Sequence, residues 1–177
     1  MSHRIHLAMA TITVSSILSL TGSAQEATAQ APAPAAAMPA AQNVAEMKFV
    51  AFPGMPTCAS GSVQNGDPTK GPSILLAKMA AGCVFPWHWH TPNEHLMMVS
   101  GTGRLEMKDG KPVSLRPGGF AMMPSRHVHQ FGCSAACSLY VYSDGAFDMH
   151  YVDAQGKEIP PEEALKAVKE TPAPAPK

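Results

Sequence analysis

The stretch of sequence that decides the fold comprises residues 82–101, which read GCVFPWHWHTPNEHLMMVSG. His88 and His90 are two residues apart, so both side chains project from the same face of an extended strand. A Thr-Pro-Asn turn follows, and Glu94 begins the next apolar run, where its carboxylate can fold back towards the two imidazoles. The stretch therefore predicts a hairpin with three side chains of the types that bind metals.

The spacing of these residues resembles the first signature motif of the cupin superfamily, G-x5-H-x-H-x3-E-x6-G. The sequence matches it at every fixed position, from Gly82 through the two histidines and Glu94 to Gly101. The resemblance implies an all-β fold, a single cupin barrel of the double-stranded β-helix or jelly-roll type. It also implies that His88, His90 and Glu94 bind a divalent metal inside the barrel.

Cupins usually draw one more histidine from a second motif, G-x5-P-x-G-x2-H-x3-N. Residues 118–133, GGFAMMPSRHVHQFGC, supply its first glycine, its proline and its histidine, His129. Arg126 stands where the motif has glycine, and Cys133 where it has asparagine. The motif implies His129 as the fourth ligand. His127 is the alternative, either as a ligand or as a hydrogen-bonding or proton-shuttling residue behind the ligands.

Three neutral imidazoles and one carboxylate suit Fe(II), Mn(II), Ni(II), Zn(II) or Cu(II), so one divalent transition metal of unspecified identity is predicted. Four protein ligands leave an octahedral ion with an open position, which would allow catalysis. The resemblance then implies a dioxygenase-like oxidoreductase, a decarboxylase or an isomerase that acts on a small oxygen-rich molecule. Glu94 would act as ligand, as base, or as both in turn.

A non-catalytic module that binds a small molecule or the metal itself is the alternative function. The same four residues around a tetrahedral zinc would form a closed, structural site. The chain has 12 methionines, including two adjacent pairs, Met97–Met98 and Met122–Met123, which would fit copper handling. Methionine also fills irregular β-cores, and one member of each pair must face inward in a strand.

Both ends of the chain differ in composition from its middle. Residues 1–24 have the layout of a secretory signal peptide, with Arg4 near the start, an apolar run too short to span a bilayer, and small residues at the end. We therefore expect export to the periplasm or the medium, with no membrane span after processing. Residues 25–42 are rich in Ala and Pro and predict an extended linker. Residues 43–160 form the predicted domain, and residues 161–177 a short helix and a Pro/Ala tail.

The charge balance argues against nucleic acid as a partner. The sequence has 13 Lys and Arg against 13 Asp and Glu, with no basic cluster. Binding to phosphates needs a concentrated positive face. We expect a small-molecule ligand or substrate as the partner, together with a second copy of the chain, because many cupins form homodimers through sheet edges.

Short apolar runs separated by turn-forming residues predict most of the strands. They cover residues 47–52, 73–80, 95–100, 104–107, 112–115, 120–123, 129–131, 139–143 and 147–152. If Glu94 points inward, alternation places Leu96 and Met98 on the same inner face. Trp87 and Trp89 alternate with the histidines and are expected to face away from the metal.

The four cysteines fit an exported chain, in which disulfides persist. Cys133 and Cys137 flank a three-residue turn between two predicted strands, which favours a bridge across that hairpin. Cys83 would then pair with Cys58 and tie an irregular segment, residues 57–71, over the barrel near the site. A zinc site that uses Cys133 and Cys137 is the alternative, although no histidine pair has the finger spacing.

Overall fold

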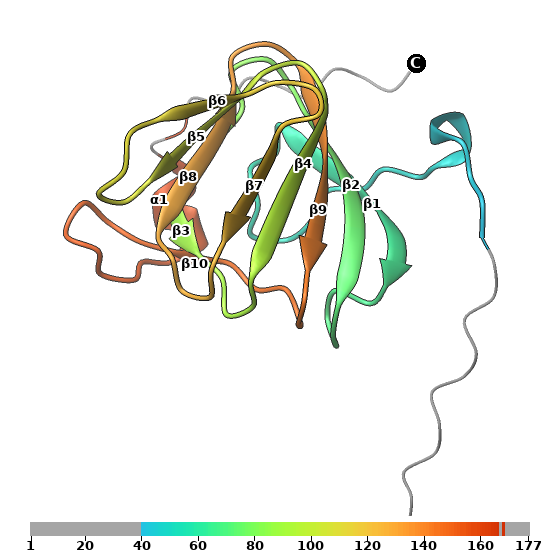
Figure 1. The fold of residues 1–177 in the computed structure, drawn as a ribbon. Coiled ribbons are helices and arrows are strands. Elements are labelled where there is room, and N and C mark those ends of the chain that lie inside the picture. Colours follow the sequence, from blue (N-terminus) through green and yellow to red (C-terminus); the bar gives the residue numbers. More distant parts are fainter. Residues whose placement is uncertain (1–39, 167, 169–177) are drawn as a thin grey trace, which may run out of the picture. The chain divides into compact units, whose positions relative to one another are not determined.

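Ten short strands form two five-stranded antiparallel sheets in the computed structural model, which describes residues 40–166 and 168 (Figure 1). The first sheet has the order β1 (Ala59–Gly66), β2 (Ser73–Met79), β9 (Cys137–Ser143), β4 (Glu94–Ser100) and β7 (Phe120–Met123). The second has the order β10 (His150–Tyr151), β3 (Val84–Trp89), β8 (His129–Cys133), β5 (Gly103–Met107) and β6 (Val113–Leu115). A 3-10 turn, η1 (Val44–Glu46), precedes them, and α1 (Pro161–Lys166) follows. The predicted all-β fold is confirmed. The predicted signal peptide, most of the linker and the end of the tail lie outside the described residues.

The inner faces of the two sheets form a shared core, and β4 shows how the sequence builds it. Side chains along this strand alternate between buried and more exposed, with Leu96 and Met98 both under 5% exposed, as predicted. They belong to the same cluster as Leu105 and Phe131 from the second sheet. Glu94 lies on this inner face, so its carboxylate enters the space between the sheets.

Two predictions for the chain before the first motif were wrong. Residues 57–71 were expected to be irregular, but Ala59–Gly66 form β1, which pairs antiparallel with β2. Residues 47–52 were expected to form a strand, but only Val50 makes a bridge, to Gly61. The sequence of β1, ASGSVQNG, has one β-branched apolar residue, so its pairing with the apolar β2 decides its conformation. Residues 147–152 likewise shorten to the two-residue strand β10.

Both predicted disulfides are present. Cys58, just before β1, is bonded to Cys83, just before β3, and Cys133 at the end of β8 is bonded to Cys137 at the start of β9. Each bridge therefore links one sheet to the other. The alternative of a zinc site at Cys133 and Cys137 is wrong, because both sulfur atoms are in a disulfide. Two disulfides fit an oxidising compartment.

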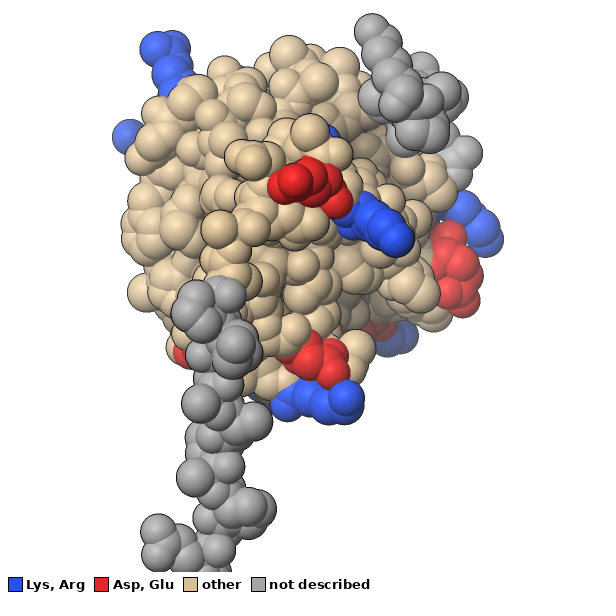
Figure 2. All heavy atoms as spheres, turned by 90° about the vertical axis from the view of Figure 1, so that its right-hand side faces the viewer, with Lys and Arg blue, Asp and Glu red and all other residues tan. Residues whose placement is uncertain are grey.

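The surface of the described residues shows no gathering of one charge on the face seen in Figure 2. Basic and acidic side chains lie scattered across it among uncharged residues. Among the helices that the structure describes, none has the length and apolar character needed to cross a bilayer.

Candidate metal centre

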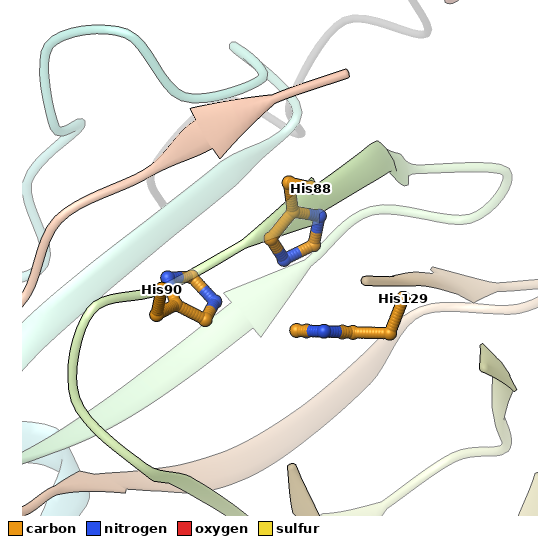
Figure 3. A group of neighbouring side chains, drawn as sticks. All are labelled: His88, His90 and His129. Atoms are coloured by element: carbon orange, nitrogen blue, oxygen red, sulfur yellow. The ribbon is translucent and has the colours of Figure 1, made fainter. Parts of the chain in front are cut away.

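Three histidines converge between the sheets (Figure 3). His88 lies near the end of β3, His90 follows that strand, and His129 is the first residue of β8. His88 and His129 are directly paired across the two strands, and their ring centroids are 4.2 Å apart. One ring nitrogen from each of the three lies within 4.8 Å of the others, and all three side chains are buried. A group with this spacing could hold a single metal ion.

Hydrogen bonds fix the orientation of each ring. The Nδ1 atoms bond to backbone carbonyl oxygens: His88 to Pro86 at 2.5 Å, His90 to Asp148 at 2.5 Å, and His129 to His127 at 2.9 Å. A carbonyl oxygen can only accept, so each Nδ1 carries the proton. In the neutral ring the lone pair is then on Nε2, which is the arrangement found in histidines that bind metals.

Glu94 lies beside the three histidines and comes from the other sheet. Its Oε1 lies 3.6 Å from the Nε2 of His90, and its Oε2 lies 3.2 Å from the Nε2 of His129. The Nε2 of His90 and the Oε2 of Glu94 are buried and have no hydrogen-bond partner among the described residues. Buried polar atoms without partners are costly, and a cation between the carboxylate and the ring lone pairs would remove that cost. The donor set therefore fits a divalent transition metal.

The protonation states of these residues agree with that fit. Burial, reinforced by His129 and His90, lowers the pKa of His88 well below its usual value. Burial also lowers the pKa of His90, although Glu94 acts in the opposite direction. Burial alone would raise the pKa of Glu94, but attraction to His90 and His129 outweighs it and the pKa is lowered. A neutral His88 and a neutral His90 beside an ionised Glu94 are the forms that bind metals.

A cavity of about 80 Å³ lies between the sheets beside this cluster. His88, Glu94 and His129 form its polar wall. In the part of the chain that the structure describes, 18 residues line the cavity, and the only other one with a polar side chain is Ser60. A small molecule in this cavity would therefore meet the proposed ligands at one end and apolar groups elsewhere.

A second group of residues supports the cluster from outside. The Asp148 carboxylate accepts the N–H of Thr91 at 2.7 Å and lies 3.1 Å from the His150 Nε2. The contact of the Asp148 carbonyl with His90 spans 58 residues and no spacing in the sequence indicates it. The Phe147 ring against His90, with centroids 4.4 Å apart, was also missed, because residues 147–152 read as one strand.

Trp89 faces away from the three histidines, as the alternation predicted. Its ring stacks on His150 with centroids 3.8 Å apart and planes within 4°. The guanidinium of Arg126 lies 4.6 Å from the Trp89 ring centre. The tryptophan thus packs on the outside of the strand that presents His88.

His127 lies outside the cluster of three histidines. It contributes its carbonyl oxygen, which orients His129. Its Nε2 is buried and has no hydrogen-bond partner among the described residues.

Comparison with known proteins identifies the fold. The cupin domain family matches residues 75–142, from β2 into β9. An RmlC-like cupin from Shewanella frigidimarina is 14% identical with a TM-score of 0.52, over 59% of this chain and 89% of that one. The DMSP lyase DddQ from Ruegeria pomeroyi is 17% identical with a TM-score of 0.50, over 65% and 61%. Salicylate 1,2-dioxygenase from Pseudoaminobacter salicylatoxidans is 16% identical with a TM-score of 0.44, over 49% and 25%.

The chain spans only part of the DddQ and dioxygenase chains. It spans about half, 53%, of a further DMSP lyase chain. No curated protein matches this sequence. The family match over residues 75–142 and the two antiparallel sheets show that this part of the chain forms a cupin domain.

Proposed function

We propose that this protein binds one divalent transition metal through His88, His90, His129 and Glu94. The observation that supports the proposal is the orientation of the three rings. Each Nδ1 is bonded to a carbonyl, so the Nε2 lone pairs meet beside a buried carboxylate. A metal bound there would supply Lewis-acid chemistry, and redox chemistry if it is iron, manganese or copper.

We further propose that the cavity beside the cluster receives a small-molecule substrate and that the protein is an enzyme. A dioxygenase-like oxidoreductase is the first candidate, with a decarboxylase or an isomerase as related possibilities. Glu94 and His129 line the cavity, so a ligand there would meet the carboxylate directly. An ionised Glu94 could take a proton from that ligand in addition to holding the metal.

A non-catalytic binding module is the second candidate. Among the described residues that line the cavity, the titratable ones are His88, Glu94 and His129, all of which are proposed ligands. This leaves no separate acid or base in the lining, which favours binding over proton-transfer chemistry. The methionine pairs give little support to copper handling, because Met98 and Met123 are part of the core.

We also propose that the protein is exported and that it forms a homodimer. The two disulfides support folding in an oxidising compartment such as the periplasm. Strand β7 is an edge of the first sheet, and its Phe120 and Met122 are 60% and 44% exposed. An exposed apolar edge strand supports pairing with a second copy, which light scattering on purified protein would detect.

Elemental analysis of the purified protein tests the metal site. We expect about one metal ion per chain in the wild type and none in the His88→Ala/His129→Ala double variant. His95→Ala is the matched control, because His95 neighbours Glu94 in sequence but lies on the other face of β4. Wild-type protein that binds no divalent metal would contradict the proposal. Oxygen consumption with diketones, flavonols and hydroxy acids then tests the dioxygenase-like candidate against the binding module.

A further inference from the structure

The cavity beside the metal centre has one polar wall and an otherwise apolar lining. The first sheet contributes Leu75, Ala77 and Val141 to it, and the second contributes Phe85 and Phe131. Segments outside the sheets add further apolar side chains, Phe52 and Met55 before β1 and Phe147 and Met149 before β10. The polar groups of a ligand therefore have partners at one end only.

The net charge of the proposed metal centre determines which polar group of a ligand is stable beside it. A divalent ion with three neutral imidazoles and the Glu94 carboxylate has a net charge of +1. No other charged side chain lines the cavity among the described residues. A charge in apolar surroundings is stabilised by one opposite charge nearby, so a single negative group would balance the centre, whereas a dianion would bury a second charge without a partner.

The lining also disfavours ligands that carry several hydroxyl groups. Away from the wall formed by His88, Glu94 and His129, Ser60 is the only described lining residue with a polar side chain. Each buried hydroxyl without a hydrogen bond costs free energy, so an oxygen-rich molecule would lose more than it gains on leaving water. The apolar lining therefore disfavours the oxygen-rich substrate that the resemblance to the cupin motifs implied.

The volume limits the length of the apolar part. The cavity measures about 80 Å³, roughly half of an apolar cavity that holds benzene. The Phe52 ring packs directly on Gly61 at the wall of the cavity, since a Cβ at position 61 would lie 2.7 Å from that ring. This space suits a chain of roughly three or four carbons.

We propose that the ligand is a short-chain aliphatic monocarboxylate, with its carboxylate at the wall formed by His88, Glu94 and His129 and its alkyl chain among the apolar side chains. This inference rests on the proposed function, because the charge balance requires the bound metal. The proposed function specified only a small molecule, and this inference narrows the ligand to a monoanion with an apolar alkyl chain.

Calorimetric titration of Ni(II)-loaded protein tests this inference, with the metal content of the same sample measured first. The probes are acetate, butanoate, butanedioate and glycerate, and butanamide serves as the neutral analogue of butanoate. We expect butanoate to bind about 15-fold more tightly than acetate, since each buried methylene contributes about fourfold. Butanedioate, glycerate and butanamide should each bind at least tenfold more weakly than butanoate. Removing the nickel should abolish butanoate binding.

A pair of variants locates the alkyl chain. Ala77→Leu fills the cavity and should weaken butanoate binding at least tenfold relative to acetate. Ala135→Leu makes the same chemical change in the exposed turn between Cys133 and Cys137 and should leave binding unchanged. Equal or tighter binding of butanedioate, glycerate or butanamide in nickel-loaded wild-type protein would overturn the inference and leave the metal site intact. A protein that takes up no metal would instead overturn the proposed function.

Discussion

Arg126 occupies a backbone conformation that the cupin motif assigns to glycine. Its φ is 62°, in the left-handed region, and its N–H donates to the His90 carbonyl at 2.8 Å. For a residue with a side chain, this conformation lowers the stability of the fold by about 1 kcal/mol. The contact of the Arg126 guanidinium with Trp89 stabilises the fold by about 0.5–1 kcal/mol. The turn of the motif is therefore preserved although its glycine is not.

Two substitutions at this position separate the two effects. Arg126→Ala keeps the strained backbone and removes the contact with Trp89, so we expect the free energy of unfolding to fall by about 0.5–1 kcal/mol. Arg126→Gly relieves the strain as it removes the same contact, so we expect a change within about 0.5 kcal/mol of zero. Urea denaturation of both variants checks this. Equal losses in the two variants would show that the backbone conformation is not strained.

At the scale of single elements, β4 and β1 show what the sequence could and could not predict. The alternation in β4 is regular, so spacing alone placed Glu94, Leu96 and Met98 on one face of the strand, and the resemblance to the cupin motif indicated that this face points inward. Strand β1 is rich in Gly, Ser and Asn, and its conformation depends on pairing with β2 over all its length except one irregularity. The contact between Asp148 and His90 also depends on tertiary structure, so local patterns contain no information about it.

The two disulfides should contribute unequally to stability. The Cys58–Cys83 bond closes a loop with a sequence separation of 25, against 4 for Cys133–Cys137. Loop-closure entropy then assigns about 3.5 kcal/mol to the first and about 2 kcal/mol to the second. We expect the double variant Cys58→Ala/Cys83→Ala to lose more free energy of unfolding than Cys133→Ala/Cys137→Ala. Guanidinium denaturation of both measures the order, and the reverse order would contradict the loop-closure argument.

At the scale of the whole molecule, the proposed ligands come from both sheets. His88 and His129 belong to the second sheet and Glu94 to the first, so a bound metal would connect the two layers across the core. An ion that binds only the folded state stabilises it by about 4 kcal/mol at a concentration 1,000 times its Kd.

Metal binding should therefore raise the melting temperature. We expect removal of the metal by a chelator to lower Tm by about 10 °C or more, as measured by calorimetry. Glu94→Gln should show a much smaller difference between the metal-loaded and metal-free forms, because the link to the first sheet is weakened. His95→Ala should keep the full difference. A wild-type Tm that does not respond to metal would mean that the four side chains do not hold the two sheets together through an ion.

The hydrogen bonds of the three imidazoles also set an order of assembly. His88 and His129 are oriented by carbonyls two residues earlier in the chain, whereas His90 depends on a carbonyl 58 residues later. The rings of His88 and His129 can therefore be oriented by their own strands. The third ring has its acceptor only after the segment leading into β10 has reached β3, the last contact along the chain that the site requires. The orientation of all three rings therefore requires that the segment leading into β10 is in place, so a metal ion bound by all three would report that the C-terminal part of the domain is folded.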